Sequence, residues 1–313
     1  MSGIAFLFPG QGSQYVGMGK AFYEAYPSVK RLFDEASDVT HKDLARLCFE
    51  GPEATLVQTG NVQPAITLIS LACRQVLQEE GVEPSVVAGH SVGEYAALCA
   101  AGAVAFADAI RLVEIRGAAM QTEAERHPGT MAAVFGLDAA VLADLCDEVG
   151  AGTVQVANHN AAGQVAVTGA AAGVLEVTKA AKARGAKLVV PLKVSGPWHS
   201  RFMSGAQAPL ARALAQCAVS APRIATIANV TAQPYGPDPE IIRRTLVEQI
   251  VSPVLWSQSM NALVLQGVRT FVEVGPGRVL SGLLKGVGQG LTVLNVQDSE
   301  TLTKFRAAYQ RPV

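Results

Sequence analysis

The sequence predicts an α/β protein in which a larger domain is interrupted by a small ferredoxin-like subdomain. Short apolar runs alternate with segments of helical periodicity, which is typical of layered α/β architectures. Between residues 130 and 192 the expected order is strand, helix, strand, strand, helix, strand, which is the βαββαβ pattern of ferredoxin-like folds. The 313 residues are 50% hydrophobic, so a large core can form. We therefore expect residues 1–127 and 198–313 to form the larger domain and residues 128–197 the subdomain.

The individual elements follow from the spacing of apolar residues and from the turn residues that bound them. Short apolar runs that end at Gly or Pro predict strands, and apolar residues three or four apart predict helices. In the first part of the chain these patterns predict strands at residues 4–8 and 85–88, and helices at 62–80, 94–101 and 108–121. Gly102 is expected to close the second of these helices and Asp108 to start the third.

The same patterns predict the rest of the chain. The subdomain is expected to contain strands at 131–137, 154–158, 164–168 and 187–192, with helices at 139–149 and 174–184. After it we expect a helix at 200–216 and strands at 224–229 and 270–274. The sequence contains no repeat, low-complexity segment or long linker.

The charge pattern argues against polyanionic partners. The formal net charge is −1, and the lysines and arginines are scattered along the sequence. Nucleic acids and anionic membranes require concentrated basic surfaces, so we expect neither as a partner. The longest apolar stretch, residues 95–107, is shorter than the ~20 residues of a membrane-spanning helix. The apolar run at 4–8 has no basic segment before it, so we expect no signal peptide.

The cysteines favour a reducing compartment. The five cysteines are widely spaced without a Cys-x-x-Cys pair, and their odd number argues against a disulfide framework. No cluster in the sequence has the ligand spacing of a metal site. We therefore expect a cytoplasmic protein that holds no metal or redox cofactor. We also expect a monomer, although no sequence pattern determines the oligomeric state.

The most informative motif is Gly89-His90-Ser91-Val92-Gly93, which lies between a predicted strand and a predicted helix. In a Gly-x-Ser-x-Gly elbow the serine occupies a strained turn, and the flanking glycines relieve crowding around it. An anion that formed at Ser91 would meet the free amides and the positive end of the helix. A Gly-Ser turn before a core helix would explain the motif equally well, so other segments must decide.

Two features in the first half of the chain could belong to the same pocket. Gly10-Gln11-Gly12 follows the first strand, and its glycines would let backbone amides approach a ligand as an oxyanion hole requires. A tight turn explains that segment about as well. Arg116 lies on the helix after the elbow, where a buried guanidinium could bind a carboxylate with two hydrogen bonds. Taken alone, an arginine at such a position is more commonly a surface residue.

Two features in the second half could supply a base. Gly196-Pro197-Trp198-His199-Ser200 places a histidine just before a predicted helix, where the dipole disfavours the imidazolium and favours a neutral base. Gln249 could orient that base through its amide or its backbone carbonyl. Each feature alone is weak, because a lone histidine there is usually a capping or surface residue. Their occurrence together, in this order, is the stronger indication.

Together these motifs resemble those of the malonyl-CoA:acyl carrier protein transacylases of fatty acid synthesis. The resemblance covers essentially the whole chain and includes the stretches at 61–65, 158–165 and 272–277. It implies a hydrolase-like larger domain, with the active site in the cleft beside the ferredoxin-like subdomain. It also implies two substrates, malonyl-CoA and phosphopantetheinylated acyl carrier protein, and no other cofactor.

The resemblance assigns catalytic roles to five residues. Ser91 is expected to be the nucleophile and His199 the general base, oriented by the backbone carbonyl of Gln249. The amides of Gln11 and Val92 are expected to stabilise the oxyanion. The result would be a malonyl-serine ester and ping-pong kinetics.

Three further residues are expected to bind substrate. Arg116 would pair with the malonyl carboxylate and so discriminate against acetyl groups. Trp198 stands where malonyl-selecting relatives commonly have phenylalanine, and its larger indole should crowd a branch at C2. His90 lies beside the serine and is expected to shape the elbow. The segment 158–162 also departs from the family's more usual Asn-Tyr-Asn-Ser-Pro, without a predicted effect.

Three alternatives remain open. A stand-alone acyltransferase that loads polyketide synthase carriers would use identical chemistry, although the Gly-Pro-aromatic-His form favours the fatty acid enzyme. A serine acyl hydrolase would release free malonate without a carrier, and Arg116 and the second subdomain count against it. A non-catalytic carrier-binding protein is disfavoured because Ser91 and His199 are both intact.

Overall fold

The computed structural model describes residues 3–150 and 152–309, and within these ranges the chain forms two separate sheets. The larger sheet is parallel and contains, in spatial order, β7 (Ala225–Ile227), β2 (Val86–Gly89), β1 (Ile4–Phe8), β8 (Thr270–Val274) and β9 (Thr292–Val296). The smaller sheet is antiparallel and contains β4 (Val154–Ala161), β5 (Gln164–Gly169), β3 (Thr130–Phe135) and β6 (Leu188–Pro191). The predicted α/β class is confirmed.

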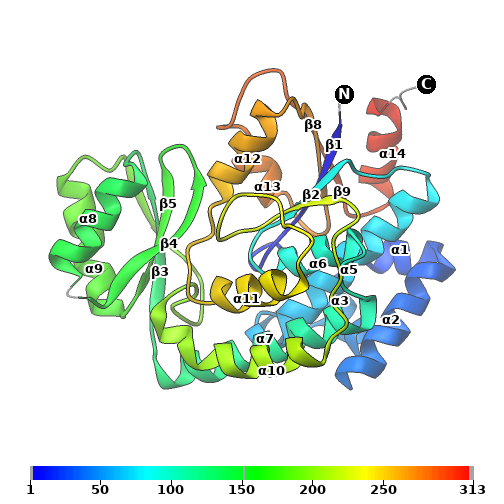
Figure 1. Ribbon diagram of the computed structural model, residues 1–313, viewed down its shortest axis with the longest axis horizontal. Coiled ribbons are helices and arrows are strands. Elements are labelled where there is room, and N and C mark those ends of the chain that lie inside the picture. Colours follow the sequence, from blue (N-terminus) through cyan, green and yellow to red (C-terminus); the bar gives the residue numbers. More distant parts are fainter. Residues whose placement is uncertain (1–2, 151, 310–313) are drawn as a thin grey trace.

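Helices surround the larger sheet and cover one face of the smaller one (Figure 1). Before the smaller sheet the chain forms α1 (Lys20–Ala25), α2 (Pro27–Thr40), α3 (Leu44–Glu50), α4 (Glu53–Leu56), α5 (Thr59–Glu79), α6 (Gly93–Ala100) and α7 (Phe106–Arg126). The smaller sheet carries α8 (Ala139–Val149) and α9 (Ala171–Ala183). After it come α10 (Gln207–Gln216), α11 (Pro239–Gln249), α12 (Trp256–Leu265), α13 (Val279–Leu284) and α14 (Ser299–Ala308). In the described part of the chain no helix is long and apolar enough to cross a membrane.

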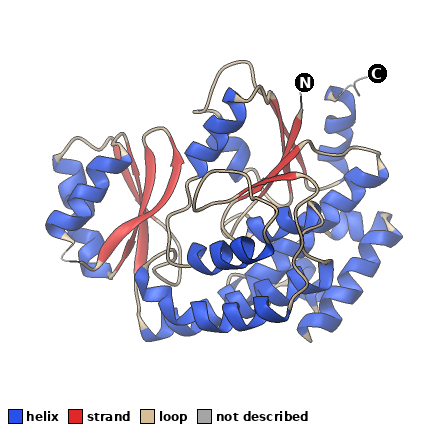
Figure 2. Cartoon of the chain, in the orientation of Figure 1, coloured by secondary structure: helices blue, strands red, loops and turns tan. Residues whose placement is uncertain are grey.

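Strand β1 lies at the centre of the larger sheet and separates two apolar cores. All of its residues are buried. Phe6 and Phe8 belong to the core that includes α5 and α6, whereas Ala5 and Leu7 belong to the core that includes α12 and α13. A parallel sheet is covered on both faces, so its strands are continuous apolar runs. Figure 2 shows the helices on both sides of this sheet.

The register of β1 and β2 places two loops side by side at one edge of the sheet. The strands are parallel, and Phe8 at the end of β1 pairs with Gly89 at the end of β2. The loop that begins at Pro9 and the turn that begins at His90 therefore leave the sheet together. His90 N donates a hydrogen bond to Phe8 O at 3.0 Å, which fixes the two segments against each other. Ligands of parallel α/β sheets commonly bind at this carboxyl-terminal edge.

The smaller sheet has the predicted order of strands and helices and two chemically different faces. Val154 and Val156 of β4 join the apolar core formed with α8 and α9. Side chains alternate between the faces of a strand, so Gln155 and Ala157 point to the opposite face. Ala157 accordingly packs in the core that includes α7 and α11 of the larger unit. Strand β4 thus contacts both units.

The predicted boundaries are right for two strands and one helix whose apolar residues follow a regular pattern. The strands at 4–8 and 270–274 and the helix at 139–149 have the predicted limits. Gly102 has a φ of 73° just beyond α6, as a closing glycine should. Helix α7, however, begins at Phe106 after the N-cap residue Ala105, so the prediction that Asp108 starts it is wrong. Asp108 lies within the first turn, where its charge still favours the helix dipole.

Other boundaries differ from the prediction. Helix α5 begins at Thr59, three residues before the predicted start, and contains Pro64. The helix predicted at 200–216 is divided into a 3₁₀ segment, Arg201–Ala206, and α10. The strand predicted at 224–229 ends at Ile227. The side chain of Asn229 instead forms hydrogen bonds with the turn around Ser91. The elements α1 to α4, α11 to α14 and β9 were not predicted.

The first glycine of the serine elbow, Gly89, supplies the first testable prediction. A Cβ atom at Gly89 would overlap the backbone of Gly93 and Glu94. We expect Gly89→Ala to lower the free energy of unfolding by roughly 3 kcal/mol, because no flexible side chain can move away. Gly282 is a matched control in α13, since a Cβ there would meet nothing within 4 Å. Gly282→Ala should be neutral or stabilising by up to ~1 kcal/mol in the same urea titration. Equal effects of the two substitutions would contradict this account of the elbow.

Candidate active site

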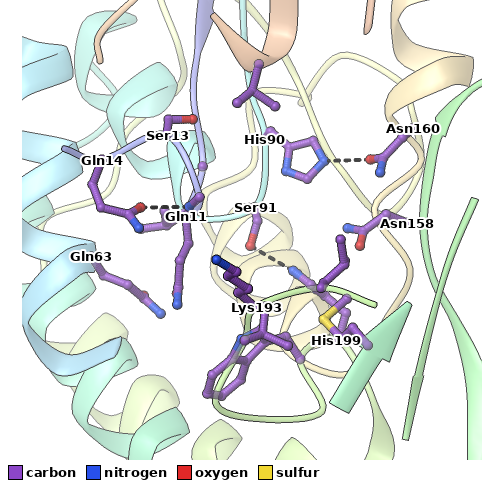
Figure 3. Close-up of a pocket in the computed structure, with 18 of the residues that line it drawn as sticks. Gln11, Ser13, Gln14, Gln63, His90, Ser91, Asn158, Asn160, Lys193 and His199 are labelled. Carbon is purple, nitrogen blue, oxygen red and sulfur yellow. Dashed lines mark hydrogen bonds between the residues drawn. The ribbon is translucent and has the colours of Figure 1, made fainter. Parts of the chain in front are cut away.

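A cavity of about 490 Å³ opens where the carboxyl-terminal edge of the larger sheet faces the smaller sheet. It is lined by the loop after β1, the turn after β2, helix α7, strands of the smaller sheet, the segment before His199, and α13. Figure 3 shows Ser91 and His199 pointing toward each other inside it, with Gln11 and Gln63 on one side and Asn158 on the other. Segments that are far apart in the sequence thus build one site.

Ser91 lies on a strained turn that buried hydrogen bonds hold in place. Its φ is 53°, in the left-handed region that costs a non-glycine residue about 1–2 kcal/mol. Ser91 N donates to Asn229 Oδ1 at 2.7 Å, and Asn229 Nδ2 donates to Gly89 O at 2.6 Å. One buried amide therefore spans both ends of the turn. The strain persists because the surrounding structure fixes the backbone.

The hydroxyl of Ser91 contacts an imidazole whose proton position is determined by its partners. Ser91 Oγ lies 2.7 Å from His199 Nε2, and His199 Nδ1 lies 3.0 Å from Gln249 O. A backbone carbonyl can only accept a hydrogen bond, so Nδ1 must carry the proton. Nε2 is then free to accept the proton of the serine hydroxyl. This is the arrangement of a nucleophile with its general base.

The environment of His199 keeps its imidazole neutral. The side chain is 3% exposed, and burial together with the nearby Arg116 charge lowers the pKa of His199 to about 3. The predicted cause of this neutrality, the dipole of a following α-helix, is wrong. A six-residue 3₁₀ segment follows instead, and burial is the larger cause.

Arg116 is a buried cation beside the serine. Its side chain is 1% exposed, contrary to the usual expectation for a lone arginine on a helix. Nη1 donates to Gln63 Oε1 at 2.8 Å, and Nη2 donates to Gln249 Oε1 at 2.8 Å and to Ser91 Oγ at 3.2 Å. Among the described residues no carboxylate lies within ion-pair distance of it. A buried charge without a counter-ion is costly, so this position favours an anionic ligand.

The nearest compensating charge is Glu94, one amide away. Gln249 Nε2 donates to Glu94 Oε2 at 2.6 Å, while Oε1 of the same amide accepts from Arg116. Tyr235 Oη and Asn229 N also donate to the carboxylate, at 2.5 and 3.2 Å. Burial raises the pKa of Glu94 to about 7, and these hydrogen bonds oppose the rise. A guanidinium can only donate, so Oε1 of the Gln249 amide faces Arg116 and Nε2 faces Glu94.

The structure places every predicted site residue at or against one cavity. Ser91, His199 and Arg116 meet directly, and Gln249 contacts all three from behind the cavity wall. The other four, which are Gln11, Val92, His90 and Trp198, line the same cavity. Four residues of the site were not predicted: Gln63, Glu94, Asn229 and Tyr235. Of these, Glu94 follows the glycine of the elbow directly and Gln63 lies in the family-like stretch at 61–65, whereas Asn229 and Tyr235 had no signal.

Three lining residues have identifiable orientations. Gln11 lines the cavity, and its Nε2 donates to Thr59 Oγ1 at 3.3 Å. His90 Nε2 lies 3.1 Å from Asn160 Oδ1, so the elbow is tied to the smaller sheet. Trp198 is 6% exposed and packs in the core around α7.

The comparisons with known proteins agree on one family. Residues 5–307 match the family model described as the acyl transferase domain. The malonyl CoA-acyl carrier protein transacylase of Bacillus subtilis is 45% identical over 304 residues, which covers 96% of both chains. The enzyme of the same name from Escherichia coli is 42% identical over 294 residues, or 93% of this chain and 95% of that one.

The architecture is also similar to that of a solved malonyl-transacylase. The chain is similar to a malonyl-transacylase solved together with its type II polyketide synthase acyl-carrier protein, with a TM-score of 0.93 and 41% identity. The superposition covers 97% of this chain and 98% of that one.

The depressed pKa of His199 predicts a specific loss of stability in acid. Below pH 6.5 the unfolded chain protonates this histidine, whereas the folded chain keeps it neutral down to about pH 3. Stability should therefore fall as the pH falls below 6.5, by roughly 2 kcal/mol from this group at pH 5. We expect the change in unfolding free energy between pH 7.5 and 5, measured in urea, to be smaller in His199→Gln by about that amount. Identical pH dependence of the two proteins would mean that His199 titrates normally.

Proposed function

This chain belongs to the acyl transferase domain family, and from that premise we propose that it moves a malonyl group from malonyl-CoA to the phosphopantetheine thiol of acyl carrier protein. It is an acyltransferase. The observation that carries the proposal is the 2.7 Å contact between Ser91 Oγ and His199 Nε2, with the Arg116 guanidinium 3.2 Å from the same oxygen. A nucleophile, a neutral base and a buried anion site adjoin one another.

The first half of the reaction loads the serine. Ser91 Oγ attacks the thioester carbonyl as its proton passes to His199 Nε2, and the amides of Gln11 and Val92 stabilise the resulting oxyanion. The C–S bond then breaks, and His199 returns the proton to the coenzyme A thiolate. The products are free coenzyme A and a malonyl-Ser91 ester.

The second half reverses these steps with a different thiol. The phosphopantetheine thiol gives its proton to His199 and attacks the ester carbonyl, and the ester C–O bond breaks as Ser91 Oγ regains a proton. Gln249 supports both halves, because its carbonyl accepts from His199 Nδ1 whether or not Nε2 is protonated. The two half-reactions share one site, so the kinetics are ping-pong.

Selection for malonyl groups follows from the buried charge. The malonyl carboxylate would give Arg116 the anionic partner that it lacks, while an acetyl group would leave the guanidinium without one. Gln63 holds the guanidinium from the side opposite Gln249. Trp198 lines the cavity beside the base, and its indole would crowd a substituent at C2 of the acyl group.

The carrier and the pathway are proposed from the relatives. Transacylases from Bacillus subtilis and Escherichia coli support transfer to acyl carrier protein in fatty acid synthesis. The solved polyketide synthase complex favours, as a second candidate, a carrier of polyketide synthesis. Transfer rates to the two types of holo carrier would separate these candidates. A serine hydrolase is disfavoured, because the buried Arg116 serves a substrate carboxylate and not the attack of water.

We also propose the finer architecture that the resemblance implies. The parallel sheet with its serine elbow supports a hydrolase-like domain of residues 1–127 and 198–313. The four-stranded antiparallel sheet with helices on one face supports a ferredoxin-like subdomain of residues 128–197. The proposed reaction needs only the two thioester partners, with no further cofactor, and a monomer would suffice for it.

The covalent intermediate is directly testable. Brief exposure to malonyl-CoA should add one malonyl group to the peptide that contains Ser91, detected by mass spectrometry. Holo acyl carrier protein should then remove it, and Ser91→Ala should remain unlabelled. A malonyl group on another residue, or none, would refute the mechanism.

The proposed role of Arg116 predicts a change in selectivity. We expect Arg116→Ala to lose malonyl transfer by at least about a hundredfold, because a charged hydrogen-bonding partner of the carboxylate is removed. Acetyl transfer should fall much less, so the ratio of the two kcat/KM values should shift toward acetyl. Equal losses for both acyl groups would exclude Arg116 as the selecting residue.

A further inference from the structure

We propose that Gln155, on strand β4 of the smaller sheet, is a positioning residue for the general base. Its side-chain amide contacts the backbone of His199, Arg201 and Val251, yet it does not line the cavity. The inference rests on the role of His199 as base in the proposed function. It assigns the smaller sheet a part in setting the geometry of catalysis.

The side-chain amide of Gln155 binds two segments of the backbone, residues 199–201 and residue 251. Gln155 Nε2 donates to His199 O at 3.1 Å and to Val251 O at 3.3 Å. Gln155 Oε1 accepts from Arg201 N at 3.1 Å. The first contact is to the carbonyl of the base residue itself, and the third is to the amide two residues later. The second lies two residues after Gln249, whose carbonyl orients the imidazole. The base and the group that orients it are therefore held by the same side chain.

The backbone at His199 needs such support. Its φ is 57°, a left-handed conformation that a non-glycine residue holds only at a cost of about 1–3 kcal/mol and only when its surroundings fix it. The peptide that Gln155 binds is the one that follows this φ. If the peptide relaxed, the imidazole would turn away from Ser91 Oγ, because ring and backbone share the same Cα.

Strand β4 is itself anchored to the segment that carries the second contact. Val254 N donates to Ala157 O, and His159 N donates to Val254 O, both at 2.9 Å. Asn158 and Val254 form a short parallel bridge between the two units. Gln155 thus projects from a strand whose position relative to residues 251–254 is fixed by backbone hydrogen bonds. A rigid support of this kind is what a positioning residue requires.

The test is Gln155→Met, which keeps the length of the side chain and removes all three hydrogen bonds. We expect kcat for malonyl transfer to fall by about tenfold to a hundredfold, because a small displacement of a base costs that much. KM for malonyl-CoA should stay within about twofold, since Gln155 does not line the cavity. If Gln155 had a purely structural role, the substitution would lower the stability of the protein without lowering kcat selectively over KM.

The matched control is Gln258→Met. Gln258 Nε2 lies 2.9 Å from His159 Nδ1, so it also links the larger unit to β4 through one side-chain amide. It contacts neither the base nor the cavity, and its kcat should stay within about twofold of the original. If Gln155→Met does not fold, Gln155→Glu replaces it. That variant keeps the acceptor for Arg201 N but turns a carboxylate oxygen toward two carbonyls, and the same fall in kcat is expected.

A second readout separates this inference from the proposed function. Phenylmethanesulfonyl fluoride reacts with an activated serine and needs no malonyl group. Its rate of reaction with Ser91, followed by mass spectrometry, should fall in Gln155→Met as kcat does and stay unchanged in Gln258→Met. If the original protein does not transfer malonyl groups, the proposed function is refuted. If sulfonylation is still lost selectively in Gln155→Met, the inference about Gln155 is supported even then. An unchanged kcat, a rise in KM alone, or equal losses in both variants would overturn it.

Discussion

The structure depends on a buried positive charge that has no direct carboxylate partner. Arg116 is held by the side-chain oxygens of Gln63 and Gln249, and the nearest compensating charge, Glu94, lies on the far side of the Gln249 amide. A carboxylate in direct contact would have neutralised the guanidinium and left little attraction for a ligand. With the amide between them, the folded chain tolerates the buried cation while its remaining potential is directed at the cavity.

Gln249 connects this charge to the chemistry. Its side chain joins Arg116 to Glu94, and its backbone carbonyl fixes the proton on His199 Nδ1. In the proposed function, the residue that holds the selecting guanidinium therefore also sets the tautomer of the base. The same Arg116 charge lowers the pKa of His199, so the imidazole remains an acceptor beside the serine hydroxyl. The groups proposed to select the substrate and to transfer the proton are therefore joined in one buried hydrogen-bond network.

The sequence predicted the parts of this site that local pattern determines. The run at 4–8 and the glycines of the elbow specify a strand and a turn by themselves, and the order of motifs identified the family. Burial of Arg116 was not predictable, because it depends on α5, α7 and α11 closing around it. Asn229 gave no signal, since one buried asparagine looks like any other in a sequence. Helix α2 was missed although its buried residues Val29, Phe33 and Ala36 have the spacing of an amphipathic helix, so the sequence did contain a signal for it.

The central claim is that Arg116 reserves its charge for a substrate carboxylate, and ligand affinity measures this most directly. Isothermal titration of Ser91→Ala, which cannot form the ester, with malonyl-CoA and with acetyl-CoA compares the two acyl groups without turnover. A charged hydrogen bond in a buried site corresponds to a difference of at least about tenfold in Kd, with malonyl-CoA binding more tightly. Equal dissociation constants for the two thioesters would contradict the account.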